Sequence, residues 1–161
     1  MVTQGPAHPL GRLILSMGVR AFVDTNVFVH LYSSDDPAKR DVARDLLSHD
    51  DMDLVLSAQV LNEFYGAVTR KITSPLSPGD ARDAVGSLAE LEVVPVTRNL
   101  VVDALDAGQS YQLSRWDSLI IEAASRSGCE ILFTEGLSSG VILRGVTITN
   151  PFLGQTVAED E

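Results

Sequence analysis

The chain has 161 residues, 45% of them hydrophobic, which suits one globular domain with a sizeable core and argues against a disordered protein. With 12 basic against 22 acidic residues the formal charge is −10, so the surface as a whole does not attract nucleic acid. The single cysteine, Cys129, excludes an internal disulfide and a zinc site built from several thiolates, and no apolar run is long enough to cross a bilayer. Because the start is also a poor signal peptide, we expect a cytoplasmic protein.

The two ends of the chain differ from the rest. Residues 1–16 are rich in glycine and proline and show no periodicity, so we expect a flexible leader, with Met17 as a candidate biological start. Residues 155–161 form an acidic tail, which we interpret as solvated. The domain itself is expected to span residues 17–154.

Between these ends, apolar runs typical of strands alternate with segments of helical periodicity. In chain order, we expect strands at 19–24, 54–56, 93–96, 130–134 and 146–149, and helices at 26–32, 37–47, 58–71, 78–91, 99–111 and 115–127, with Ser57, Ser77 and Ser114 as N-caps. Pro95 cannot donate to a ladder, which favours an edge position for its strand. The alternation indicates βαβ units and an α/β fold, a three-layer α/β/α sandwich with a mainly parallel central sheet.

Two acidic residues follow predicted strands. Asp24 ends the first strand, and Glu135 follows the strand at 130–134. Ligands of open α/β sheets bind at the carboxyl edge, where both side chains should lie. An acid buried there is costly unless positive charge pairs with it.

Two further acids lie on predicted helices. Glu63 stands three residues after Val60, on the shoulder of a buried stripe, although a solvated glutamate is the alternative. Asp117 begins a helix whose buried stripe should include Trp116 and Ile120. Its spacing from the Ser114 cap also suits a capping box, and an acid in the first turn complements the helix dipole.

Such acids would not tolerate one another alone. Two unit charges 4 Å apart repel by about 4 kcal/mol at an effective dielectric near 20, whereas a domain is stable by only about 5–15 kcal/mol. A divalent cation reverses the sign of the interaction. With oxygen ligands, no cysteine cluster and no paired histidines, Mg²⁺ or Mn²⁺ fits better than zinc.

Four segments, in their order and rough spacing, resemble the motifs of the PIN domain family. They are Phe22-Val23-Asp24-Thr25-Asn26, Leu61-Asn62-Glu63-Phe64, Arg115-Trp116-Asp117-Ser118-Leu119-Ile120 and Phe133-Thr134-Glu135. The resemblance extends over about residues 19–152, and the compact layout is similar to VapC-type toxins of bacterial type II toxin–antitoxin pairs. It implies a Mg²⁺- or Mn²⁺-dependent endoribonuclease that cleaves RNA phosphodiesters with metal-activated water. It also implies a homodimer and inhibition by a small cognate antitoxin.

By motif match, the resemblance assigns the metal and the chemistry to Asp24, Glu63 and Asp117. Relatives often carry an acid just after the Thr-Glu pair, where this chain has Gly136. The role of fourth ligand is therefore expected of Glu135.

Supporting roles remain open between a functional and a structural interpretation. Thr134 would orient a water or a carboxylate, or is simply a strand residue. Asn26 would bond Asp24 or cap the next helix, and Arg115 would hold a phosphate or be solvated. His30 has no partner histidine, so we interpret it as structural or exposed.

Two other functions fit part of this pattern. A phosphatase of haloacid-dehalogenase type also has an Asp after its first strand, but it needs a second Asp where this chain has Asn26, and a later lysine, absent after Lys71. A catalytically weak, PIN-like protein-binding module is favoured by Gly136 alone.

Overall fold

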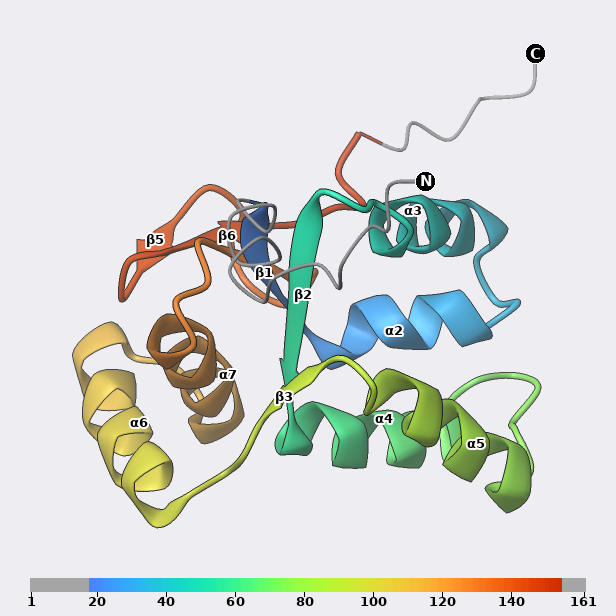
Figure 1. Ribbon diagram of the computed structural model, residues 1–161, viewed down its shortest axis with the longest axis horizontal. Coiled ribbons are helices and arrows are strands. Elements are labelled where there is room, and N and C mark those ends of the chain that lie inside the picture. The colour runs from blue at the N-terminus through green and yellow to red at the C-terminus, as the bar shows by residue number, and fades with distance from the viewer. Residues whose placement is uncertain (1–17, 155–161) are drawn as a thin grey trace, which may run out of the picture.

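The computed structural model describes residues 18–154 (Figure 1). The leader expected at 1–16, the candidate start at Met17 and the tail expected at 155–161 lie outside this range. The elements are β1 (Val19–Val23), α2 (Thr25–Tyr32), α3 (Pro37–Leu47), β2 (Met52–Ser57), α4 (Ala58–Arg70), α5 (Pro78–Leu88), β3 (Glu92–Val94), α6 (Arg98–Tyr111), α7 (Arg115–Arg126), β4 (Ile131–Phe133), β5 (Ile142–Leu143) and β6 (Val146–Thr149). None of the helices in the described range is long and apolar enough to span a membrane.

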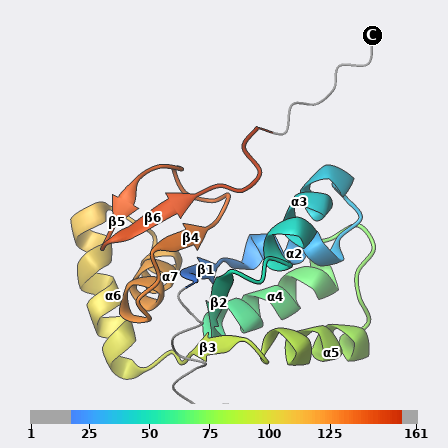
Figure 2. The ribbon, with the colours of Figure 1, turned by 45° about the horizontal axis from the view of Figure 1, so that its top comes forward.

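The strands form one sheet in the order β3-β2-β1-β4-β6-β5. Every neighbouring pair is parallel except β5 and β6, which are antiparallel. Figures 1 and 2 show α6 and α7 on one side of the sheet and the group α2 to α5 on the other. The predicted α/β sandwich with a mainly parallel sheet is confirmed, and β3 lies at the edge, as Pro95 indicated.

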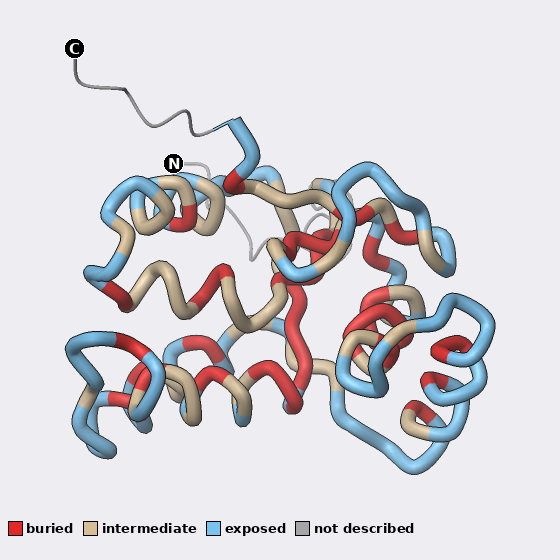
Figure 3. Tube along the Cα trace, turned by 180° about the vertical axis from the view of Figure 1, so that it is seen from behind, coloured by how far each residue is buried: buried red, intermediate tan, exposed pale blue. Residues whose placement is uncertain are grey.

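The direction in which the chain adds strands reverses at β1. From β1 the chain continues to β2 and β3 on one side, and later places β4 on the other side. Figure 3 shows buried residues along the central strands and the inner sides of the helices, and Ala21, Phe22 and Val23 of β1 are fully buried. In such sheets, the crevice outside the carboxyl ends of the strands at the reversal is where ligands bind.

The predicted caps are confirmed. The hydroxyls of Ser57, Ser77 and Ser114 accept the backbone N–H groups of Val60, Asp80 and Asp117, respectively. Each cap satisfies a donor that the first turn of a helix leaves unpaired. Cys129 is buried.

Two predictions about local structure were wrong. Trp116, expected in the buried stripe of α7, is 52% exposed, because the first turn of that helix borders a groove rather than the sheet. Strand β5 was missed, since it has only two residues and joins β6 through Arg144 and Gly145. Both residues have positive φ, 52° and 77°, which suits a tight hairpin turn. Arginine is uncommon at such positions, so the sequence does not indicate the turn.

A buried carboxylate holds this hairpin to α7. Glu122 is only 1% exposed, and its two oxygens accept hydrogen bonds from Arg144 at 3.0 and 3.1 Å. Arg126 donates to the same carboxylate at 3.2 Å and also pairs with Asp103 of α6. The charge of Glu122 is therefore compensated by two arginines, which connect α6, α7 and the turn between β5 and β6.

We expect Glu122→Ala to lower the free energy of unfolding by about 1.5–3 kcal/mol, because it removes the buried carboxylate that accepts charge-assisted hydrogen bonds from two partly exposed arginines. Asp103→Ala removes a partner of Arg126 that is 49% exposed, and should change stability by less than about 1 kcal/mol. Urea unfolding followed by circular dichroism measures both. Equal losses in the two variants would contradict this account.

Candidate active site

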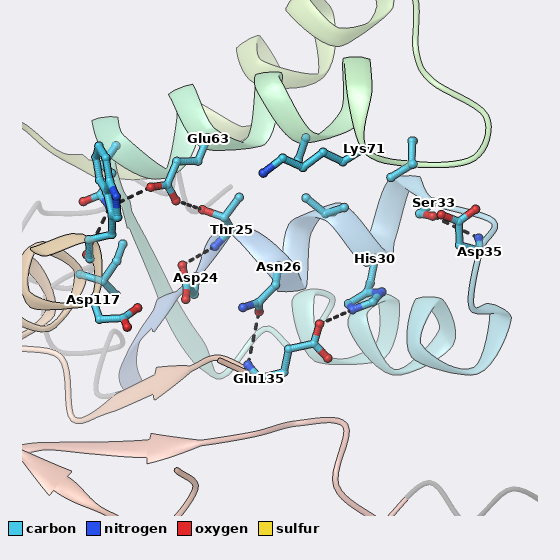
Figure 4. Close-up of a pocket in the computed structure, with 16 residues that line it drawn as sticks. Asp24, Thr25, Asn26, His30, Ser33, Asp35, Glu63, Lys71, Asp117 and Glu135 are labelled. Carbon is cyan, nitrogen blue, oxygen red and sulfur yellow. Dashed lines mark hydrogen bonds and ion pairs between the residues drawn. The ribbon is translucent and has the colours of Figure 1, made fainter. Parts of the chain in front are cut away.

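A pocket of about 410 Å³ opens at the carboxyl edge of the sheet. All four acids predicted from the sequence line it (Figure 4): Asp24 between β1 and α2, Glu63 of α4, Asp117 of α7 and Glu135 just after β4. In Figure 4, Asp24 and Asp117 lie toward one end of the pocket, and His30 and Asp35 lie toward the other.

Asp24 is partly buried and joins three elements. Its side chain caps α2 by accepting the backbone N–H of Thr25 at 2.7 Å, and its other oxygen accepts the hydroxyl of Thr134 at 2.8 Å. Burial raises the pKa of Asp24, and the charges of Glu63 and Asp117 raise it further. The two hydrogen bonds lower it, but burial is the larger effect, so the pKa lies above its ordinary value. The carboxylate is well bonded, but no Lys, Arg or His side chain of residues 18–154 forms an ion pair with it.

Glu63 is held from two sides. One oxygen accepts the hydroxyl of Thr25 at 3.0 Å, and the other accepts the side-chain amide of Gln59 at 3.0 Å. The same amide of Gln59 donates to the backbone carbonyl of Trp116 at 3.3 Å, which connects α4 to the start of α7. Glu63 thus lies on the shoulder of its helix, as predicted, whereas the bridging role of Gln59 was not foreseen.

Asp117 is the least constrained of the acids. Its backbone N–H donates to Ser114 at 3.1 Å, but its carboxylate accepts no hydrogen bond from the residues that the structure describes. It is nevertheless near enough to Asp24 to raise the pKa of that group. Asp117 therefore makes only the Ser114 half of the capping box that its spacing suits, and its carboxylate lines the pocket.

Glu135 differs from the other three because a lysine ammonium already pairs with it. It bonds His30 at 2.7 Å and Lys39 at 2.8 Å. Burial raises the pKa of Glu135, but the hydrogen bonds and charges of Lys39 and His30 outweigh it and hold the pKa below its usual range. The ring of Phe152 packs edge-on against His30, with centroids 4.8 Å apart. Sequence reasoning missed both partners of Glu135, since they come from α2 and α3.

Thr134 and Asn26 connect Asp24 to the segment after β4. The fully buried hydroxyl of Thr134 donates to Asp24 and accepts from the Asn26 amide at 3.3 Å and from the Gly136 N–H at 3.1 Å. Thr134 therefore orients a carboxylate, one of the roles expected of it. Neither role expected of Asn26 is observed: Asp24 is the cap, and the carbonyl of Asn26 instead accepts the backbone N–H of Glu135 at 3.4 Å.

Arg115 lies outside the lining of the pocket. Its guanidinium is 5.0 Å from the centre of the Trp116 ring, a cation–π arrangement, and the residue is exposed. A contact with phosphate remains a prediction for this residue.

The oxygen ligands at this edge suit a hard divalent cation, although their side chains stand apart from one another. Within residues 18–154, no group of three or more His, Cys, Asp or Glu side chains has the proximity needed to hold a metal ion. Asp24, Glu63 and Asp117 nevertheless share one pocket, and the last two raise the pKa of the first. A bound cation would remove this repulsion, and the donor set, three carboxylates, is of the oxygen type that hard divalent cations bind.

Thr134→Val should lower the free energy of unfolding by about 1–3 kcal/mol, because it keeps the shape but removes the hydrogen-bond partner of one Asp24 oxygen, of the Asn26 amide N–H and of the Gly136 N–H. The matched control is Thr147→Val on β6, whose hydroxyl makes no hydrogen bond among the described residues. Its effect should stay within about 0.5 kcal/mol. Similar thermal midpoints for the two variants would contradict the role given to Thr134.

A family model for the PIN domain matches residues 21–137, and no curated protein matches the chain. Among solved structures, one similar chain is the Mycobacterium tuberculosis toxin VapC20, described as cleaving the sarcin-ricin loop (19% identity, 70% of this chain and 86% of that chain, TM-score 0.58). Others belong to a toxin–antitoxin complex from Klebsiella pneumoniae (17% identity, 82% and 98%, TM-score 0.63) and to DNA-bound VapBC from Salmonella typhimurium (18% identity, 83% and 98%, TM-score 0.58).

At these identities, the structural likeness shows a common fold. The family match adds independent support, since it includes most of β1, all of β2 to β4 and all four predicted acids. The chain belongs to the PIN domain family.

Proposed function

We propose that this protein is a metal-dependent endoribonuclease that acts in the cytoplasm as the toxin of a type II toxin–antitoxin pair. The observation that carries the proposal is the shared pocket of Asp24, Glu63 and Asp117 at the strand-order reversal of a PIN fold. The description of VapC20 as a toxin that cleaves the sarcin-ricin loop supports RNA as the substrate. The toxin–antitoxin complexes among the similar structures support a small protein antitoxin as partner.

In this proposal, Asp24, Glu63 and Asp117 hold Mg²⁺ or Mn²⁺. When bound, such an ion supplies activation of water and charge stabilisation at a phosphodiester. The chain's own contribution is orientation: Thr25 and Thr134 fix the two oxygens of Asp24, and Thr25 with Gln59 fixes those of Glu63. These bonds orient the carboxylates of Asp24 and Glu63, whereas the carboxylate of Asp117 accepts no such bond from the described residues.

Glu135 has a more distant role in this scheme. Its bonds with His30 and Lys39 engage both oxygens and neutralise its charge. We therefore assign it to the wall of the pocket, as a weaker candidate for the fourth ligand than its place in the sequence indicated.

The two alternative functions are not equally supported. The match to the PIN domain leaves the phosphatase hypothesis without support. The protein-binding module is favoured by Gly136 and by the separation of the candidate ligands, and metal binding by the antitoxin-free protein decides between it and the nuclease. A homodimer is proposed from the resemblance to VapC-type toxins.

Asp24→Asn and Asp117→Asn should each lower the rate of RNA cleavage at least about 100-fold in antitoxin-free protein with Mn²⁺, because each removes a ligand charge. Glu135→Gln should have a smaller effect, since the carboxylate already pairs with Lys39. Asp106→Asn, an exposed acid on α6, is the control and should cleave at the wild-type rate. Wild-type activity in Asp24→Asn, or no heat of Mn²⁺ binding to the wild type, would overturn the proposal.

Gly136→Asp should strengthen Mn²⁺ binding. A side chain at this position would begin 3.6 Å from the Thr134 hydroxyl and 3.9 Å from the Asn26 amide, in ordinary contact and beside the groups that surround Asp24. We expect a tenfold or greater gain in affinity by calorimetry, roughly 1.4 kcal/mol. Ser138→Asp adds the same charge at an exposed position nearby and is the control. Equal gains in both variants would indicate a general charge effect instead.

A further inference from the structure

A second groove adjoins the acidic pocket on the side of α4. It has a volume of about 690 Å³. The two cavities share the lining residues Thr25, Gln59, Glu63, Ala67, Lys71 and Trp116. A ligand that extends from the acids along α4 would therefore enter this groove without crossing a barrier of protein.

Trp116 is the most unusual residue of the groove. It is 52% exposed, and it is the only tryptophan in the chain. The amide of Gln59 holds its backbone carbonyl at 3.3 Å, and Arg115 lies 5.0 Å from the ring centre. The backbone of Trp116 is thus held next to Asp117, yet half of its large aromatic ring remains in water, where it contributes little to folding.

The charges around the ring differ from those of the molecule as a whole. The groove is lined by Arg70 and Lys71, although the chain carries a formal charge of −10. In Figure 4, the amino group of Lys71 points along α4 toward Thr25. Tyr65, 37% exposed, lines the same groove. Basic side chains interleaved with exposed aromatic rings are what single-stranded nucleic acid binds.

We propose that the groove is a nucleobase subsite, in which an unpaired base of the RNA stacks on Trp116 while Arg70 and Lys71 neutralise neighbouring phosphates. The inference rests on the proposed function for its choice of RNA. It selects unpaired RNA because a base inside a duplex has both faces covered by its neighbours. A peptide from a protein partner could also contact Trp116, but phosphates account for the cations as well as for the ring.

The sole tryptophan makes the subsite directly observable. In EDTA, where metal-dependent cleavage does not occur, a short single-stranded oligoribonucleotide should quench the fluorescence of antitoxin-free protein, and a blunt duplex of the same sequence should not. Trp116→Leu should weaken binding of the labelled single strand about 5- to 150-fold by anisotropy, and Trp116→Phe much less. Tyr111→Leu, at a 42% exposed aromatic residue of α6, is the matched control and should bind like the wild type.

The basic residues have a separate signature. The double substitution Arg70→Gln, Lys71→Gln should make the dependence of log affinity on log salt shallower by about 1.4, which corresponds to two phosphate contacts on a single strand. An unchanged slope, equal quenching by the duplex, or unchanged affinity in Trp116→Leu would overturn the proposal. Loss of antitoxin binding alone in Trp116→Leu would assign the groove to the protein partner. Selective quenching without cleavage in Mn²⁺ would support the subsite while refuting the nuclease.

Discussion

The partly buried negative charge of Asp24 is the constraint on which the carboxyl edge of the sheet depends. This one carboxylate caps α2 and receives the hydroxyl of Thr134 at the end of β4, so it fixes a helix and two strands relative to one another. Its raised pKa means that the fold prefers the protonated form. The stability it contributes is greatest at low pH and falls as pH rises through the raised value, until a cation compensates the charge.

The pocket has two electrostatic regions as a result. Around Asp24, the carboxylates of Glu63 and Asp117 add negative charge, whereas Glu135 is already neutralised by Lys39 and His30. A divalent cation would bind at the first region. In the second region, Lys39 already pairs with the carboxylate of Glu135. Under the proposed function, two regions of different charge within a single pocket would orient a phosphodiester. The side chains that connect the strands and helices at this edge are therefore also those that set the charge of the pocket.

The sequence predicted those parts of the molecule that depend on neighbours along the chain. Asp24 and Glu135 were located because each follows an apolar strand, and parallel strands bring their carboxyl ends to one edge. Interactions between distant elements left no such pattern. The pairing of His30 and Lys39 with Glu135 depends on how α2 and α3 pack, and the exposure of Trp116 depends on where α7 leaves the sheet.

The two borders of the sheet have a consequence for self-association. One border is β3, with three residues, and the other is β5, with two. Such short edges offer few unpaired backbone groups to a strand from another molecule, which protects the sheet against edge-to-edge aggregation. A dimer of this chain would therefore be built from helix surfaces and not from a sheet continued across two molecules.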